Sequence, residues 1–290
     1  MLTGYLYNIL IFSGIYAILT VSLNMAVGFT GLLNLGHVAF FGIGAYTSTL
    51  LNMNGVPYIV SLIVAGLVSS VFGVILMYAV RKLKGDYLAL ATLGFSFVVY
   101  SVMLNWSSLT RGPLGIPGIP KPELFGWTIN TTSEYLAFTL IVATVSIYII
   151  NRITTSRYGK LLEAVRDDEV GLSVYGKPIF SLKVRSLAIS AFFAGIAGSL
   201  FAHHITFIDP SSFYINDLVL LLTIVLVGGL ANNKGVIIAT VIIMLIPEAL
   251  RFVDMPSSIL GPARQMIYAI VLIGILLFKP RGLFGRIDLE

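Results

Sequence analysis

Side chains that could carry chemistry are few in this sequence. Its 290 residues include three histidines and no cysteine, which excludes disulfides, thiolate metal sites and cysteine nucleophiles. The adjacent His203 and His204 would point to different faces of a helix, so we do not expect them to share a metal ion. The sequence has no GxxxxGK[ST] segment to hold nucleotide phosphates. We therefore predict no catalytic residue, no metal site and no cofactor.

Acidic residues inside apolar segments would indicate a carrier driven by protons or sodium ions, because the coupling ion binds near the middle of the bilayer. The candidates are Asp86, Glu134, Asp217 and Glu248. Each lies in a loop or within about one turn of the end of a predicted helix, and Glu248 is one turn from Arg251. We interpret them as charges at the membrane interface, which argues against ion coupling.

Uncharged polar residues are scattered through the apolar segments. The segment NLGHVAFFGIGAY contains His37 among small residues, where a histidine that bonds two helices together and a pore-lining or gating histidine are both open readings. Apolar walls with few polar groups suit a pathway that touches its cargo weakly. Such a pathway would fit a small apolar amino acid, and equally an amide, urea or a sugar. The candidate pathway residues are Asn34, His37, Thr47, Thr92 and Ser96, with Asn24 and Asn105 as further polar positions.

The composition places most of the chain in lipid. Hydrophobic residues make up 57% and charged residues 11%, and the mean hydropathy is +0.96, whereas roughly a quarter of a soluble domain is charged. The net charge of +5 is not accompanied by a basic patch with stacking aromatic residues, so no nucleic-acid partner is predicted. The lipid bilayer is the expected surrounding.

The apolar residues form about nine runs long enough to be membrane helices. They show no alternation of period two, and backbone groups cannot remain unpaired in lipid, which indicates helices and excludes a barrel. The N-terminus lacks the basic and small-residue regions of a cleaved signal peptide, so its run is the first predicted span. The fold class predicted is all-α, a polytopic transmembrane helix bundle forming one domain over residues 1–290. The runs are Tyr5–Val27, Leu33–Leu51, Tyr58–Val80, Tyr87–Trp106, Glu134–Ile150, Ser186–His203, Asp217–Leu230, Val236–Phe252 and Gln265–Phe278.

Lysine and arginine are distributed unevenly between alternate loops of the nine-helix arrangement. One set of loops holds 14 of the 18 basic residues, and cytoplasmic loops carry such an excess. We therefore predict a cytoplasmic C-terminus and an outer N-terminus. The 14 are Arg81, Lys82, Lys84, Arg152, Arg157, Lys160, Arg166, Lys177, Lys183, Arg185, Lys234, Lys279, Arg281 and Arg286.

Two connections are unusually long. The outer one, residues 107–133, contains RGPLGIPGIPKPELFG, whose prolines and glycines predict a structured but non-helical loop. It would be either a plain connector or a docking platform for a partner outside the membrane. The inner one, residues 151–185, mixes charges of both signs with apolar residues at helical spacing, and Gly176 and Pro178 suit a helix end. We predict a short amphipathic helix there, on the cytoplasmic surface.

Small residues recur within the predicted helices, a pattern that lets membrane helices approach closely. We interpret them as packing residues. They are Gly66, Ser69, Ser70 and Gly73 in one helix and Ala191, Ala194, Gly195, Ala197, Gly198 and Ser199 in another.

Four stretches, in order and across essentially the whole chain, resemble the permeases of branched-chain amino-acid ABC importers. They are GLLNLGHVAFFGIGAYTS (31–48), RGPLGIPGIP (111–120), residues 161–202 beginning LLEAVRDDEVGLSVYGKP, and IPEALR (246–251) with the closing KPRGLFG (279–285). One turn departs from the family: GGLANNKGV at residues 228–236 replaces the common GGLGSLWGP.

The resemblance implies a type II-like permease in a prokaryotic plasma (inner) membrane. Its implied partners are a homologous permease, two cytoplasmic ABC ATPase subunits and an extracytoplasmic solute-binding protein. The inner amphipathic helix would then be the coupling helix. The residues that would face or shape the ATPase contact are Glu163, Ala164, Arg166, Asp167, Asp168 and Gly171, with Gly176 ending the helix.

Two other functions are compatible with the residues alone. A facilitative channel for a small polar solute such as urea, an amide or a sugar would also lack midplane charges, but it leaves the charged inner helix without a purpose. A non-transporting membrane scaffold is the second alternative.

Overall fold

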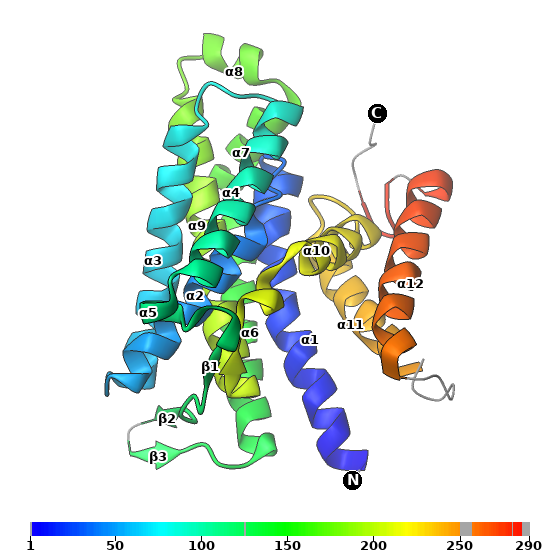
Figure 1. Cartoon of the computed structure of the whole chain (residues 1–290). Coiled ribbons are helices and arrows are strands. Elements are labelled where there is room, and N and C mark those ends of the chain that lie inside the picture. The colour runs from blue at the N-terminus through cyan, green and yellow to red at the C-terminus, as the bar shows by residue number, and fades with distance from the viewer. Residues whose placement is uncertain (1, 125, 250–256, 280, 286–290) are drawn as a thin grey trace.

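The computed structural model describes residues 2–124, 126–249, 257–279 and 281–285. These residues form a bundle of helices with two very small antiparallel sheets (Figure 1). In chain order the elements are α1 Leu2–Asn24, the π-helical turn η1 Met25–Phe29, α2 His37–Met53, α3 Tyr58–Ala79, α4 Asp86–Asn105, α5 Ser107–Thr110, η2 Gly112–Leu114, β1 Ile116–Pro117, β2 Glu123–Leu124, β3 Trp127–Thr128, α6 Thr132–Thr154, α7 Arg157–Asp167, α8 Glu169–Val174, α9 Ile179–Ile205, β4 Phe207–Ile208, η3 Pro210–Phe213, α10 Ile215–Gly228, α11 Asn233–Ala249 and α12 Ser257–Phe278.

Six of the described helical segments are long and apolar enough to cross a membrane. They contain α1, α3, α4, α6, α9 and α10, and each overlaps a run predicted from the sequence. The other apolar helices are the 17-residue α2 and the shorter apolar parts of α11 and α12. The all-α membrane fold is thereby confirmed, while the number of about nine spans stays a prediction.

Helix α2 lies at the centre of the bundle, buried along nearly its whole length against α3 and α9, with side-chain contacts to α1. Close backbone approach makes this packing possible: a Cβ atom on Gly44 would lie 2.3 Å from Cα of Gly195 in α9, and one on Gly195 would lie 2.6 Å from the carbonyl oxygen of Ala65 in α3. The small residues predicted to pack helices do so here.

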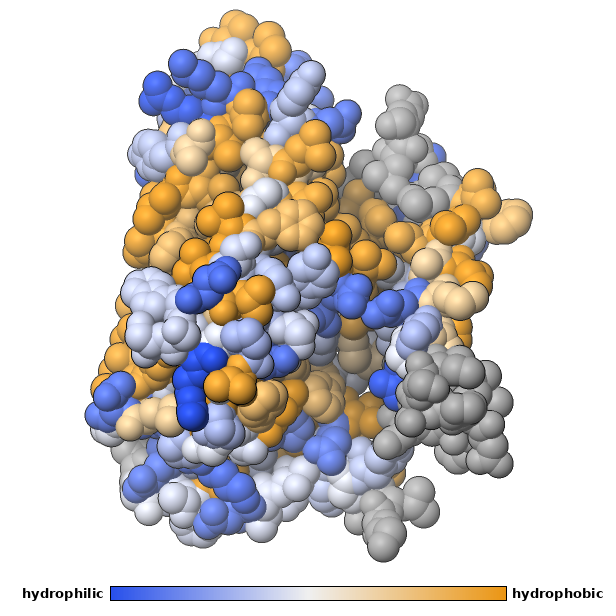
Figure 2. All heavy atoms as spheres, in the orientation of Figure 1, coloured by the Kyte–Doolittle hydropathy of each residue, from blue (hydrophilic) through white to orange (hydrophobic). Residues whose placement is uncertain are grey.

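The outer surface of the bundle is apolar. Side chains on α3 and α4 such as Val71, Ile75 and Val98 are more than half exposed, as expected for helices that face lipid. Figure 2 shows this hydrophobic surface on the half of the bundle toward α8, with hydrophilic residues next to α8 and from the middle of this face to the opposite end.

The long outer connection is more helical than predicted. It begins with the helical turn α5 and the 3-10 turn η2, and only then becomes extended. The expectation of a wholly non-helical loop was wrong, because the first proline is Pro113 and nothing before it prevents a helical turn. The extended part pairs β1 with β4, Ile116 opposite Ile208, and β2 with β3.

The start of the chain and the inner connection, residues 151–185, lie at opposite ends of the bundle. Helix α1 begins at one end, and α7 and α8 form the other (Figure 1). Helix α10 is short, begins partway along the bundle (Figure 1), and packs against α1, α11 and α12. Residues 30–36 before α2 are irregular backbone except for a turn, whereas residues 206–214 before α10 contain β4 and the 3-10 turn η3.

Candidate functional site

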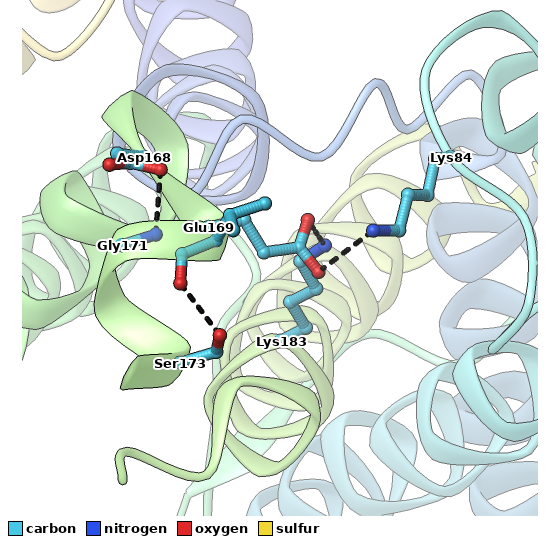
Figure 3. Close-up of polar contacts among 7 residues, drawn as sticks. Lys84, Asp168, Glu169, Gly171, Ser173 and Lys183 are labelled. Carbon is cyan, nitrogen blue, oxygen red and sulfur yellow. Dashed lines mark hydrogen bonds and ion pairs between the residues drawn. The ribbon is translucent and has the colours of Figure 1, made fainter. Parts of the chain in front are cut away.

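The inner connection forms two helices in place of the single helix predicted. Helix α7 ends at Asp167, and α8 starts again at Glu169. The break occurs because Asp168 leaves the helical conformation, with φ −152° and ψ 90°, and its Oδ1 accepts a hydrogen bond of 2.8 Å from the Gly171 backbone N–H (Figure 3). An aspartate that caps a new helix competes with continuation of the old one. Gly176 follows α8 with φ +68°, the left-handed conformation predicted for it.

An ion-pair cluster fixes α8 to the rest of the chain. The Glu169 carboxylate accepts a hydrogen bond from Nζ of Lys183 at 2.8 Å and lies 3.8 Å from Nζ of Lys84 (Figure 3). Lys183 belongs to α9 and is 15% exposed, whereas Lys84 belongs to the turn between α3 and α4 and is 72% exposed. Because exposed pairs contribute little, the Lys183 contact is the stronger anchor. It ties α8 directly to a membrane helix.

The side of α8 that faces away from the bundle is hydrophobic. Val170, Val174 and Tyr175 expose 71%, 81% and 81% of their surface. They lie at the extremity of the molecule, beyond the end of the membrane helices, where Figure 2 shows a hydrophobic cap. Large apolar side chains exposed together mark a surface that contacts another protein, a membrane or a ligand. We name Val170, Val174 and Tyr175 the apolar tip.

The side of α7 that faces the bundle is in contact with the membrane helices. Leu162 and Val165 are buried, and Nη1 of Arg166 donates a 2.8 Å hydrogen bond to the carbonyl oxygen of Gly28 in η1. The Tyr158 hydroxyl donates to the Leu182 carbonyl at 3.3 Å. Burial raises the pKa of Tyr158 to about 12, with Arg185 opposing the rise, so this hydroxyl keeps its proton at neutral pH. Motion of α7 would therefore be transmitted to α1 and α9.

The predicted coupling residues divide into groups. Glu163, Ala164 and Gly171 are half-buried, and Arg166 points back to η1, although its Nε also donates to Asp167 at 2.8 Å. Asp167, Asp168 and Gly176 are exposed. Sequence reasoning missed Glu169 and the apolar tip. The signal available was the apolar pair Val174 and Tyr175 next to Gly176 in an otherwise polar segment.

A buried amide network joins α1, α6, α11 and the turn after α10. The Asn24 Nδ2 donates to Oδ1 of Asn233 at 3.0 Å, and Asn24 Oδ1 accepts from the Ala231 N–H at 3.1 Å. Nδ2 of Asn233 donates to the Thr154 hydroxyl at 3.0 Å. The turn after α10 thus contacts α1 beside Gly28, the residue that Arg166 bonds. The sequence offered Asn24 as a polar position but not this partner set.

The closing KPRGLFG segment packs against the same turn. The Leu283 N–H donates to the carbonyl of Val227 at 2.8 Å, and a Cβ on Gly229, whose φ is +96°, would lie 2.2 Å from the Gly285 nitrogen. The departure from the family pattern in residues 228–236 is accommodated here by Ala231, which takes a positive φ of 57°.

Four of the five predicted pathway residues meet around the irregular segment 30–36. The Thr92 hydroxyl accepts from the Leu35 N–H at 3.0 Å, and the Ser96 hydroxyl donates to the Leu35 carbonyl at 3.3 Å. Asn34 Oδ1 accepts from the Gly36 N–H at 3.0 Å. Irregular backbone at membrane depth requires such partners, so these side chains hold the segment against α4.

His37 is fully buried and bonds two helices together. Its Nε2 lies 3.0 Å from the Ser22 hydroxyl and 3.1 Å from the Leu19 carbonyl, both in α1. Its Nδ1 lies 3.4 Å from Asn34 Nδ2. This contact matches the reading of an inter-helix histidine. Thr47 lies apart from the group, nearly three turns further along α2 than His37.

Ser96 also lines a narrow pocket between helix starts. The pocket is bounded by Val38 in the first turn of α2, by Tyr100 in α4 and by Tyr214 and Ile215 at the start of α10. The starts of α2 and α10 therefore lie close together here, although they come from different parts of the chain.

Asp217 is not at the membrane interface, contrary to the prediction. It accepts a hydrogen bond at 3.3 Å from the Tyr16 hydroxyl, and Tyr16 is twelve residues from one end of the first membrane segment, Gly4–Phe29, and thirteen from the other. The prediction failed because α10 starts inside the bundle, so closeness to a helix end does not mean closeness to water. The Glu248 side chain and Arg251 lie outside the described residues.

No group of three or more histidine, cysteine or acidic residues able to hold a metal ion occurs in the described ranges. The charged groups described above are instead arranged for contacts between helices of this chain.

Comparison with known proteins gives the same family over nearly the whole chain. Residues 5–278 match the family described as "Branched-chain amino acid transport system / permease component". The chain is 36% identical to "High-affinity branched-chain amino acid transport system permease protein LivM" of Salmonella typhimurium, and 35% identical to the protein of that name in Escherichia coli K12. Both alignments cover 93% of this chain and 67% of the relative.

A second group of relatives is more distant. The chain is 24% identical to "High-affinity branched-chain amino acid transport system permease protein LivH" of Salmonella typhimurium, with 98% of this chain and 96% of the relative aligned. No solved structure matches the chain.

Proposed function

The chain belongs to the family of branched-chain amino acid transport permeases, and from this premise we propose how its parts carry out import. It is a multi-pass permease component of an ABC importer for branched-chain amino acids. It forms the membrane-spanning part of the importer and does not itself hydrolyse ATP. ATP would be hydrolysed by partner subunits, and a second, homologous permease would complete the pathway. The observation that carries the proposal is the apolar tip on α8, held outside the membrane and anchored to α9.

The α7–α8 unit is the proposed contact with an ATPase subunit. Its exposed side supplies the apolar tip together with Asp167 and Asp168, while its buried side is bonded to η1 through Arg166. Glu163, Ala164 and Gly171 shape the contact from half-buried positions, and Gly176 allows the chain to turn after α8. ATP binding would move the unit as a rigid lever, and the bundle would open to the other side in response.

The proposed pathway follows the face formed by α4 and the start of α10. Ser96 and Thr92 hold the segment 30–36 in place, and movement of that segment would open or close the inner half of the pathway. At the α2 end of the segment, Asn34 contacts His37, and His37 contacts α1. Thr47, the fifth predicted pathway residue, is proposed to line the same pathway further along α2. A weakly polar wall of this kind lets an amino acid pass without being trapped.

The remaining assignments concern orientation and partners. We place the α7–α8 end in the cytoplasm because the basic residues gather there. The α1 start and the loop of residues 107–133 then face outward, where the loop would receive a solute-binding protein. The type II-like arrangement of about nine spans and the heterodimer with the homologous permease belong to the same proposal.

Reconstitution tests the proposal directly. Proteoliposomes holding this chain, its homologous permease, the ATPase subunits and the binding protein should accumulate labelled leucine against a gradient when ATP is supplied. Vesicles that lack only the ATPase subunits should not accumulate it. Concentrative uptake by those vesicles would refute the proposal.

The facilitative channel for urea, an amide or a sugar gains no support from the relatives, whose names all concern branched-chain amino acids. The reconstituted chain gives the decisive comparison. A channel would equilibrate solute without nucleotide, and an importer subunit would not.

A further inference from the structure

A polar cluster lies at the contact of α1, α10 and α12, away from the segment 30–36. Its centre is the Asp217 carboxylate, which accepts the Tyr16 hydrogen bond. The Tyr268 hydroxyl of α12 lies within electrostatic reach of Asp217 and of Arg264, which is one turn earlier on the same helix. Tyr16 and Tyr268 are 8% and 9% exposed. One acid and two phenols thus lie close together inside the membrane part of the protein, and one base, Arg264, lies near Tyr268.

The depth of the cluster is unusual for charged groups. Tyr16 lies at the middle of a 26-residue membrane segment, so at 1.5 Å per residue Asp217 lies roughly 18–20 Å from either end of that helix. An acid at this depth is retained only where it serves a pathway or a partner, because lipid does not solvate the charge.

The cluster is incompletely paired. Among the described residues, no lysine, arginine or histidine nitrogen lies within 4 Å of the Asp217 carboxylate: the ion pairs found in these ranges all lie at the α7–α8 end. The buried Nε of Arg264 has no hydrogen-bond acceptor in the same ranges. Tyr16 supplies Asp217 with a single neutral donor, which leaves acceptor capacity for a cation.

We propose that Asp217, with the Tyr16 and Tyr268 hydroxyls, is a transient binding site for the ammonium group of the amino acid in transit. This inference rests on the proposed function, since it assigns one step of import. A branched-chain amino acid is a zwitterion, and crossing the membrane's middle exposes its ammonium group to the lowest dielectric on its path. Asp217 offers the compensating charge at that depth, and Arg264 lies on the outer side of it to receive the carboxylate.

The location also fits the pathway. Helix α10 packs against α1 and α12. Its N-cap Tyr214 and first residue Ile215 line the pocket beside Ser96, and Asp217 in its first turn belongs to the cluster. A cargo that passes the start of α10 therefore meets both. On the exposed side of α12, Met266 and Ile270 are each 63% exposed, which leaves this side of the subunit open to the partner permease.

An isosteric substitution separates a charge role from a structural one. Asp217→Asn keeps an oxygen that accepts the Tyr16 hydrogen bond and removes only the charge, whereas Asp217→Glu keeps the charge. Leucine uptake per ATP hydrolysed is measured for the complete complex in proteoliposomes. We expect a tenfold or larger loss for Asp217→Asn and retention of at least a third for Asp217→Glu. The matched control is Asp209→Asn, at an outer acid that accepts from Ser211 and Ser212, with unchanged uptake expected.

Uptake per ATP within twofold of the wild type for Asp217→Asn would overturn the inference while leaving the proposed function intact. Failure of the wild-type complex to take up leucine would instead refute the proposed function. If Asp217→Asn lowered ATP hydrolysis and uptake in the same proportion, with uptake per ATP unchanged, the residue would be structural and the inference wrong.

A labelling experiment tests access independently of transport. Because the chain has no cysteine, Asp217→Cys introduces its single thiol. The probe is 2-aminoethyl methanethiosulfonate, which carries an ammonium group and has about the size of an amino acid. We expect a mass increase of this chain in at least one nucleotide state, and none for Ala143→Cys, a buried position in α6. Absence of labelling at Asp217→Cys in every nucleotide state would overturn the inference.

Discussion

Replacing Tyr175 by alanine tests the apolar tip without disturbing the permease itself. Tyr175 is 81% exposed, and substitutions at such surface positions usually change stability by no more than about 0.5 kcal/mol. The same side chain would be buried if the tip docks on an ATPase subunit. The substitution should therefore weaken association while the permease stays folded.

The expected size follows from the exposed area. A tyrosine buries about 200 Å² in a contact, so 81% of it at roughly 25 cal/mol per Å² gives a ceiling of about 4 kcal/mol. Only part of buried area becomes affinity, and an anchoring tyrosine is typically worth about 2 kcal/mol. We expect the Kd between permease pair and ATPase to rise about thirtyfold.

The assay is titration of the purified permease pair in nanodiscs with the ATPase subunit. The control is Tyr148→Ala, a 61% exposed tyrosine of α6 on the membrane segment, for which the Kd should not change. A Kd for Tyr175→Ala within threefold of the wild type would refute the assignment of α8 as the docking element.

Two further predictions concern helix packing and the break between α7 and α8. Gly44→Ala should prevent assembly of the bundle, because the new Cβ would lie 2.3 Å from the backbone of Gly195. The control variant Gly94→Ala, whose new Cβ has nothing within 4 Å, should assemble normally. The two variants are compared by size-exclusion chromatography in detergent, and equal yields of monodisperse protein would contradict the packing. Asp168→Ala should uncouple ATP hydrolysis from uptake by removing the α8 cap, which is worth about 1 kcal/mol. Asp168→Asn can still accept the hydrogen bond from the Gly171 N–H and should remain coupled. Equal uptake per ATP hydrolysed in the two variants would show that the cap is unimportant.

The helices were largely predictable from the sequence because lipid imposes a simple rule on composition. The run Tyr58–Val80 corresponds to α3 within one residue. Where the prediction fell short, charged residues were the cause: α9 begins at Ile179, not Ser186, since Lys183 and Arg185 extend a helix beyond its apolar part. Apolar content finds the membrane segment and not the helix boundary.

The site was less predictable because its contacts join distant parts of the chain. The charged inner segment was correctly found, but its break at Asp168 depends on a local competition between caps that composition does not reveal. Asp217 was placed at an interface because the irregular start of α10 inside the bundle leaves no mark in hydropathy. Its pairing with Tyr16 spans 201 residues, beyond the reach of any local pattern.

The central position of α2 has a consequence for biosynthesis. Gly44 reaches its neighbour Gly195 only after about 150 further residues have been made, which takes roughly 8–30 s at 5–20 residues per second. During that interval a helix with polar groups such as Ser48 and Thr49 must wait in the membrane without α9. Insertion factors that protect newly made membrane segments would act on α2. Slowing the ribosome before α9 should increase degradation of the permease.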